Sequence, residues 1–229
     1  MYPMMGDSTF LLLIPALLLA FFAQARVSGA FAKYSRVHAS RGVSADTVAR
    51  MLLDRFGLND VRIERVRGEL TDHYDPRSKV LRLSDSVGGS SSIAAIGVAA
   101  HEVGHAIQDG SGYSPLRLRN MLVPVASLGS NGAIILFMIG LFMGLGPLMN
   151  IGILLFAGAV VFHVVTLPVE FDASSRALKL LSSTGVLSAN ETAGARSVLN
   201  AAALTYVAAT IMAVSQLMRL LILARNRRN

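Results

Sequence analysis

The sequence predicts a mainly α-helical membrane protein with about four transmembrane helices and a small α+β domain. Hydrophobic residues make up 53% of the 229 residues and charged residues only 15%, so the chain is richer in apolar side chains than a soluble globular domain usually is. Four apolar runs approach or reach the roughly 20 residues that cross a bilayer as a helix. These runs lie at residues 10–25, 120–145, 148–167 and 204–218.

The first and last apolar runs need separate interpretations. The first lacks a positive stretch before it and a convincing small-residue cleavage site after it, so we expect an anchor at residues 8–25 and not a signal peptide. The last run carries Thr205, Gln216 and Arg219. It is predicted as a C-terminal helix at residues 203–223 that either crosses the bilayer or lies on its surface.

The distribution of basic residues predicts the side of the membrane on which each segment lies. No Lys or Arg precedes the first run, and none lies in the turn "GLGPLMN" at residues 144–150. Basic residues gather instead near the ends of the first two runs, at Arg26, Lys33, Arg36, Arg41, Arg117 and Arg119. By the positive-inside rule, residues 26–119 are expected in the cytoplasm of a bacterial cell, with the chain in its inner or plasma membrane. This distribution explains the net charge of +7 without a nucleic-acid partner.

One segment conflicts with this topology. Four crossings would put the basic tail "ARNRRN" outside the cell, against the positive-inside rule. Either the first span sets the orientation of the whole chain and the tail lies outside, or the last helix lies on the membrane surface and does not cross.

Local patterns predict the elements of the α+β domain. Residues 43–56 have the apolar spacing of an amphipathic helix, with Ser44 as its N-cap and Gly57 as its stop. The apolar stripe of this helix is Val48, Met51 and Leu52. Residues 61–66 and 80–84 alternate apolar and polar side chains and predict two strands, while "DHYDPRSK" between them has the composition of a turn.

The stretch "AAHEVGHAIQDG" at residues 99–110 carries the main functional signal. Serines at residues 90–92 offer an N-cap and Gly110 a stop, which together predict a helix of about 17 residues. Its apolar part, residues 93–100, is too short to cross a bilayer. We therefore expect a buried helix of the cytoplasmic domain.

His101 and His105 lie four residues apart, so they share one helix face and can present two imidazoles to one metal ion. Glu102 is turned about 100° from His101 and is expected to take the proton of an activated water, as in H-E-x-x-H metallopeptidases. Residues 93–108 hold no other charged side chain, and this buried polar cluster would be costly without a metal or partners. An ordinary buried helix is the alternative.

The H-E-x-x-H pattern predicts zinc, and the available donors limit how it can be held. The chain has no cysteine, so a metal must be held by nitrogen and oxygen ligands. We expect one Zn²⁺ per chain, and the same donors also suit other divalent metals. A catalytic zinc keeps three protein ligands and one open position, so the sequence must supply a third ligand.

A downstream carboxylate is favoured as the third ligand over another histidine. Position 111, where the extended H-E-x-x-H-x-x-G-x-x-H pattern requires histidine, is Ser. His163 lies within an apparent span and His38 directly after the anchor. Neither histidine is a natural partner of the motif helix.

Glu170 is the preferred third ligand. Thr166 and Pro168 predict the start of a new helix, with Glu170 near its first turn. Asp172 is the alternative, but it lies about 200° around the helix from Glu170 and has Arg176 at i+4 for an ion pair. Glu170 shares its face with small residues that allow close packing of another helix, namely Ala173, Ser174 and Ala177.

Two further features suggest a substrate cleft. His73 and Tyr74 in "DHYDP" are candidates to line the cleft and stabilise the oxyanion, with a purely structural surface turn as the alternative. The segment "KVLRLS" at residues 79–84 is either an edge strand that pairs with an extended peptide or a purely structural strand. Gly104 is expected to permit close helix packing.

With these residues identified, the chain resembles the YugP-type membrane zinc metallopeptidases, a group similar in arrangement to the HtpX-type proteases. The resemblance implies a zincin-like, gluzincin-type domain in which His101, His105 and Glu170 carry zinc and Glu102 is catalytic. HtpX-type proteins tend to carry an aspartate four residues after the glutamate ligand, where this chain has Ser174. The segments that carry the resemblance are the anchor, the membrane hairpin and residues 72–84, 92–108 and 168–174.

These observations predict a membrane-embedded zinc endopeptidase. After the anchor, its expected parts are a cytoplasmic zincin-like domain at residues 26–119, a transmembrane hairpin at 120–167, a helical part of the catalytic domain at 168–202, and the C-terminal helix. Expected substrates are peptides or membrane proteins at the bilayer surface, and analogy with HtpX-type proteases suggests membrane protein quality control. The alternatives are a site-2-type intramembrane protease and a non-catalytic, metal-stabilised membrane scaffold.

Overall fold

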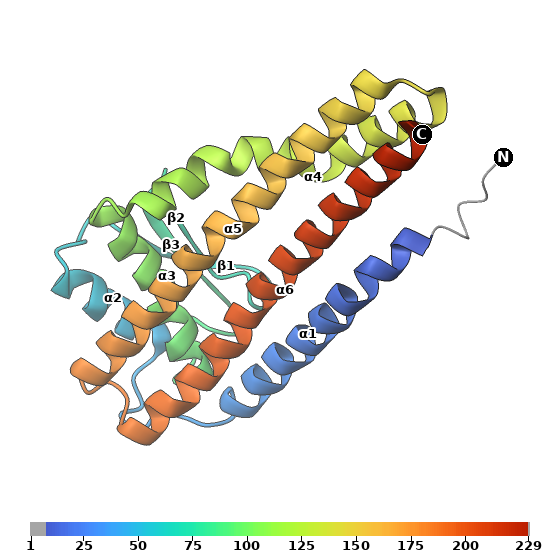
Figure 1. Cartoon of the computed structure of the whole chain (residues 1–229). Helices are drawn as coiled ribbons and strands as arrows, with labels where there is room; N and C mark the ends of the chain where they lie inside the picture. The colour runs from blue at the N-terminus through green and yellow to red at the C-terminus, as the bar shows by residue number, and fades with distance from the viewer. Residues whose placement is uncertain (1–7, 229) are drawn as a thin grey trace. The chain divides into compact units, whose positions relative to one another are not determined.

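The computed structural model describes residues 8–228, with the side chains of residues 130, 131 and 228 left out (Figure 1). Most of the described chain is helical, and a small three-stranded sheet lies between the second and third α-helices in sequence. The elements are η2 (Ser8–Leu13), α1 (Ile14–Tyr34), α2 (Ala45–Arg55), β1 (Arg62–Val66), β2 (His73–Asp75), β3 (Val80–Ser84), α3 (Ile93–Gly110), α4 (Ser114–Met143), α5 (Gly146–Ser183) and α6 (Ala189–Arg228).

Four helical segments are long and apolar enough to cross a membrane. They are Ser8–Tyr34, Ser114–Met143, Gly146–Ser183 and Ala189–Arg227. Large apolar side chains are exposed along them, which suits a surface that contacts lipid. These helices and the small sheet confirm the predicted fold class.

The chain divides into two compact units. The first comprises the chain up to Ala23, Leu118–Leu167 and the chain from Thr205, and the second comprises Gln24–Arg117 and Pro168–Leu204. Each of the four long helices α1, α4, α5 and α6 begins in one unit and ends in the other.

In the first unit, α4, α5 and α6 share a hydrophobic core. A Cβ on Gly152 of α5 would lie 2.8 Å from the carbonyl oxygen of Ala133 in α4, so glycine permits the close approach of these helices. Met149, near the start of α5, packs in the same core as Ala224, near the end of α6. The end of α6 therefore lies near the α4–α5 turn. The segment at residues 203–223, predicted as transmembrane or interfacial, belongs to a helix that is long and apolar enough to cross a membrane.

In the second unit, the sheet has the order β1-β3-β2. β1 pairs with β3 in parallel, with Arg62 opposite Val80, and β2 pairs with β3 in antiparallel, with Tyr74 opposite Leu81. β3 is therefore the central strand, so of the two alternatives for residues 79–84 the edge strand was wrong, and the segment is a structural strand. β2 lies inside the segment predicted as a turn, because a strand of three residues is too short to show an alternating pattern.

The amphipathic helix α2 packs against α3 in the core of the second unit. Val48 and Leu52 are fully buried as predicted, but Met51 is 43% exposed and its expected place in the apolar stripe was wrong. The smaller Ala49 and the adjacent Leu53 are buried instead. Ser44 occupies the N-cap position, but its side chain makes no capping hydrogen bond to the helix.

α5 continues through Pro168, so the predicted start of a new helix at this residue was wrong. The Thr166 hydroxyl, expected as a cap, instead donates to the carbonyl of Phe162, four residues earlier. Proline removes one helical hydrogen bond, but long helices tolerate this loss where neighbouring groups satisfy the backbone. The continuous helix carries Glu170 directly beyond the apolar run.

Candidate metal centre

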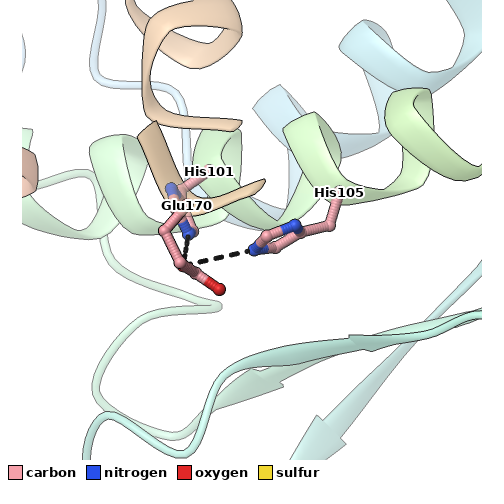
Figure 2. Close-up of side chains that lie close together, drawn as sticks. All are labelled: His101, His105 and Glu170. Atoms are coloured by element: carbon pink, nitrogen blue, oxygen red, sulfur yellow. Dashed lines mark hydrogen bonds and ion pairs between the residues drawn. The ribbon is translucent and has the colours of Figure 1, made fainter. Parts of the chain in front are cut away.

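His101 and His105 of α3 point toward Glu170 of α5 (Figure 2). One carboxylate oxygen of Glu170 lies 3.3 Å from Nε2 of His101 and 3.6 Å from Nε2 of His105. One ligand atom from each of the three residues lies within 4.8 Å of the others. Glu170 is 2% exposed. Two imidazoles and a buried carboxylate therefore converge on one point.

The local sequence of α3 explains how the histidines are presented. Ser92 caps the helix by accepting a hydrogen bond from the backbone N–H of Ala95, as predicted. The first two turns, residues 93–100, are built from small and aliphatic residues and are almost entirely buried. The helical period then places His101 and His105 on one face, where their ring centroids lie 4.7 Å apart.

Gly104 brings α3 and α5 into direct contact beside the two histidines. A Cβ at this position would lie 2.6 Å from the carbonyl oxygen of Ala173, a distance that real Cβ atoms do not reach. Ala173 and Ala177 are fully buried, so the small-residue face predicted for Glu170 is a helix-packing face. Close packing allows the short side chain of Glu170 to reach the histidines.

Hydrogen bonds on the outer nitrogens orient both imidazoles. Nδ1 of His101 lies 3.1 Å from the Ser174 hydroxyl, and Nδ1 of His105 lies 3.0 Å from Oε1 of Gln108. Such contacts direct the Nε2 atoms toward the centre and fix the ring planes. Ser174 thus contacts a histidine at the position where HtpX-type proteins tend to carry aspartate.

Gln108 connects α3 to α5 from a fully buried position. Its side-chain nitrogen donates to the carbonyl of Val169 and to the carboxylate of Asp172, both at 2.8 Å. Asp172 also forms the predicted ion pair with Arg176, at 2.5 Å. Asp172 therefore supports Gln108 and does not join the cluster of His101, His105 and Glu170.

Two glutamates act on the protonation of His105. Burial lowers the pKa of His105, but its hydrogen bond to Glu170 and the negative charges of Glu102 and Glu170 raise it more, so the net shift is upward. Glu102 is itself buried on α3 and is not one of the three converging residues. Its place next to His101 suits a group that handles a proton near the metal position.

The two residues suggested for the cleft lie on β2 and differ in exposure. His73 is exposed, and its ring nitrogens lie 2.8 Å from the carbonyl of Thr71 and 3.4 Å from the Arg82 guanidinium. Tyr74 packs against the hydrophobic core, and its hydroxyl donates to Asp109, near the end of α3, at 2.9 Å. Burial and the adjacent Asp109 carboxylate hold the pKa of Tyr74 well above its ordinary value.

The remaining histidines do not join the cluster. Nδ1 of His38 lies 3.0 Å from the Ser91 hydroxyl, ahead of the cap of α3. His163 lies in the part of α5 that belongs to the first unit. Sequence reasoning did not single out Gln108, whose place one turn after His105 was the available signal.

Comparisons with known proteins identify the family that the chain resembles. The family described as "Putative neutral zinc metallopeptidase" matches residues 9–225. "Putative membrane protease YugP" from Bacillus subtilis (strain 168) is 48% identical over 218 residues, which cover 95% of this chain and 97% of that protein. No solved structure matches the chain.

Proposed function

The chain belongs to this zinc metallopeptidase family, and from that premise we propose that it is a membrane-embedded endopeptidase with one zinc ion per chain. His101, His105 and Glu170 would hold the ion, and Glu102 would act as the general base. The observation that carries this proposal is the convergence of two imidazoles and a carboxylate within 4.8 Å from helices that are distant in sequence.

The three residues fit a zinc ion in distance and in chemistry. A tetrahedral ion with ligands at about 2.0–2.1 Å places neighbouring ligand atoms roughly 3.4 Å apart. The Glu170 oxygen lies 3.3 and 3.6 Å from the two Nε2 atoms. The Glu170 carboxylate is 2% exposed and lies beside two imidazoles, and it has no ion pair with a Lys or Arg among the described residues. A buried carboxylate of this kind is stabilised by a bound cation.

Each residue of the proposed site has its own role in peptide hydrolysis. A bound zinc ion supplies a Lewis acid that acidifies water and polarises a peptide carbonyl. Glu102 accepts the proton of the attacking water and delivers it to the leaving amine. Ser174 and Gln108 hold the two imidazoles in place while this proton moves.

The edge of the sheet at β2 suggests where the substrate lies. β2 is an edge strand and contacts α3, the helix that carries both histidines. We place an extended peptide along the outer edge of β2, where strand addition would hold the scissile bond near the site. Tyr74 anchors β2 to α3 through Asp109, so its role is to position this strand.

We place residues 26–119 and 168–202 together as the catalytic domain on the cytoplasmic side, with the hairpin at 120–167 in the membrane. Peptide segments of membrane proteins at the bilayer surface are then the expected substrates, and their removal would serve quality control. α3 is not among the four helices of the described chain that are apolar and long enough to cross. This favours a surface site over a site-2-type intramembrane site.

The test combines metal content with hydrolysis. Purified full-length wild type should hold about one zinc per chain and cleave an unstructured peptide, whereas Glu170→Ala should lose most of the zinc while its helical content survives. Asp172→Asn, at the alternative ligand position on the same helix, should keep most of the zinc because its amide oxygen can still accept the hydrogen bond from Gln108. A wild type without zinc would overturn the proposal, and full zinc in Glu170→Ala would move the third ligand elsewhere.

A further inference from the structure

A groove lies between the start of α5 and the end of α6 in the first unit. Its volume is about 480 Å³, and its walls are aliphatic, with Ile153 and Leu154 on α5 and Leu221 on α6. At the polar end the groove is lined by Asn150 and Arg225. It thus combines apolar walls with one positive charge.

The described residues of the first unit supply no carboxylate to balance the charge at this end of the bundle. The described residues of the first unit contain no Asp or Glu, whereas the end of α6 carries Arg225, Arg227 and Arg228. Arg225 is exposed, so no carboxylate of this unit's described residues can pair with it. An anion from the surroundings can therefore pair with this guanidinium.

Helix geometry places this charge at a membrane boundary. Arg225 follows Leu204, where the last apolar run begins, by 21 residues, or about 31 Å at 1.5 Å per residue. This length matches the hydrocarbon thickness of roughly 30 Å. The aliphatic walls at Leu154 and Leu221 therefore lie at the depth of acyl chains, and Arg225 lies at the depth of lipid headgroups.

We propose that this groove binds one anionic phospholipid, with its phosphate at Arg225 and one acyl chain along the aliphatic walls. A guanidinium is suited to phosphate because its N–H groups can bind two oxygens at once. The site also explains why the end of α6, which lies near the α4–α5 turn, carries several arginines. The positive-inside rule alone predicts few cations on this side of the membrane. The inference does not depend on the proposed peptidase activity.

Arg227 provides a matched control for general charge effects. It lies two residues after Arg225, turned about 200° around the helix, and does not line the groove. Its Nη2 lies 3.5 Å from the position that a Cβ on Gly144, in the α4–α5 turn, would occupy. Arg225→Gln and Arg227→Gln remove the same charge at nearly the same depth, but only the first changes the groove.

The experiment measures lipid retention by native mass spectrometry of the full-length protein in neutral detergent. Wild type titrated with phosphatidylglycerol should retain one molecule at least tenfold more tightly than phosphatidylcholine. Arg225→Gln should lose this preference, and Arg227→Gln should keep it within about twofold. Ala157→Phe, which fills the groove from α5, should also weaken retention, and unchanged thermal unfolding would show that each variant is folded.

Three outcomes would overturn the proposal. Equal retention of phosphatidylcholine would mean that the groove holds ordinary surrounding lipid. Equal losses in Arg225→Gln and Arg227→Gln would mean diffuse attraction by the tail. Displacement of the lipid by millimolar inorganic phosphate alone would mean an anion site without use of the apolar walls.

Discussion

The amide oxygen of Gln108 lies 3.0 Å from Nδ1 of His105, while its amide nitrogen donates to two acceptors on α5, the Val169 carbonyl and the Asp172 carboxylate. Because the nitrogen is committed to these acceptors, the oxygen must face the imidazole and accept a hydrogen bond from its Nδ1–H group. Neutral His105 is thereby held in the tautomer whose Nε2 lone pair points toward Glu170.

Replacing Gln108 should therefore weaken zinc binding more than it weakens the fold. Gln108→Leu keeps a side chain of similar size but removes the amide, so it releases Nδ1 of His105 and leaves Asp172 with its ion pair to Arg176. Loss of such a supporting contact typically costs 10–100-fold in metal affinity, and we expect a loss in that range. Competition with a chelator on the full-length protein measures it.

Ser111→Ala provides the control for this substitution. The Ser111 hydroxyl donates to the backbone carbonyl of Gln108 and not to its side chain, so zinc affinity should change by less than about threefold. If Gln108→Leu bound zinc as tightly as wild type, the orientation of His105 would not depend on this amide.

Glu102→Gln should separate chemistry from metal binding. The amide cannot accept a proton from water, so peptide hydrolysis should fall by at least about 10²-fold, while zinc content stays near one per chain because Glu102 is not one of the three converging residues. Parallel zinc analysis and a peptide-cleavage assay check both parts. Unchanged hydrolysis in zinc-loaded Glu102→Gln would remove Glu102 from the mechanism, and no hydrolysis by any preparation would favour the scaffold alternative.

The parts of the site that depend on one helix follow from the sequence, because the helical period alone places His101 and His105 together. The position of Glu170 follows less directly. It depends on the small face around Ala173 and on Gly104, whose close contact appears only once both helices are packed. The pairing of Gln108 with Asp172 depends on the register between α3 and α5, which no local pattern encodes.

The fold could be predicted where long continuous apolar runs form helices, but not where short strands form only by pairing with one another. The apolar runs are visible without any tertiary contact. By contrast, β2 has only three residues and acquires its place through pairing with β3 and the Tyr74–Asp109 hydrogen bond. Pro168 predicts a boundary from local rules, but α5 continues through it, since a long packed helix tolerates the loss of one backbone hydrogen bond.

Gly104→Ala should disrupt the contact between α3 and α5. Its Cβ would meet the Ala173 carbonyl at 2.6 Å, and such overpacking costs about 1–3 kcal/mol. We expect a lower unfolding temperature together with weaker zinc binding, because the histidines and Glu170 would separate. Gly29→Ala in α1 is the control, since a Cβ there meets nothing within 4 Å and alanine favours helix by up to about 1 kcal/mol. Equal effects of the two substitutions would contradict the close contact.

The stability of zinc-free protein should fall as the pH rises through neutrality. The folded-state pKa of His105 is shifted upward from its ordinary value of 6.5, so the folded chain binds this proton more tightly than the unfolded chain. The resulting stabilisation is fully present below about pH 6.5 and is lost as the pH rises through the higher folded pKa.

Bound zinc reverses this dependence of stability on pH, because protons then compete with the metal for the imidazole. Thermal unfolding of chelator-treated and zinc-loaded protein across this pH range measures both pH dependences. Glu170→Gln removes the carboxylate 3.6 Å from His105 and should flatten the pH dependence of the zinc-free protein. An unchanged pH dependence in that variant would contradict the role of the His105–Glu170 pair.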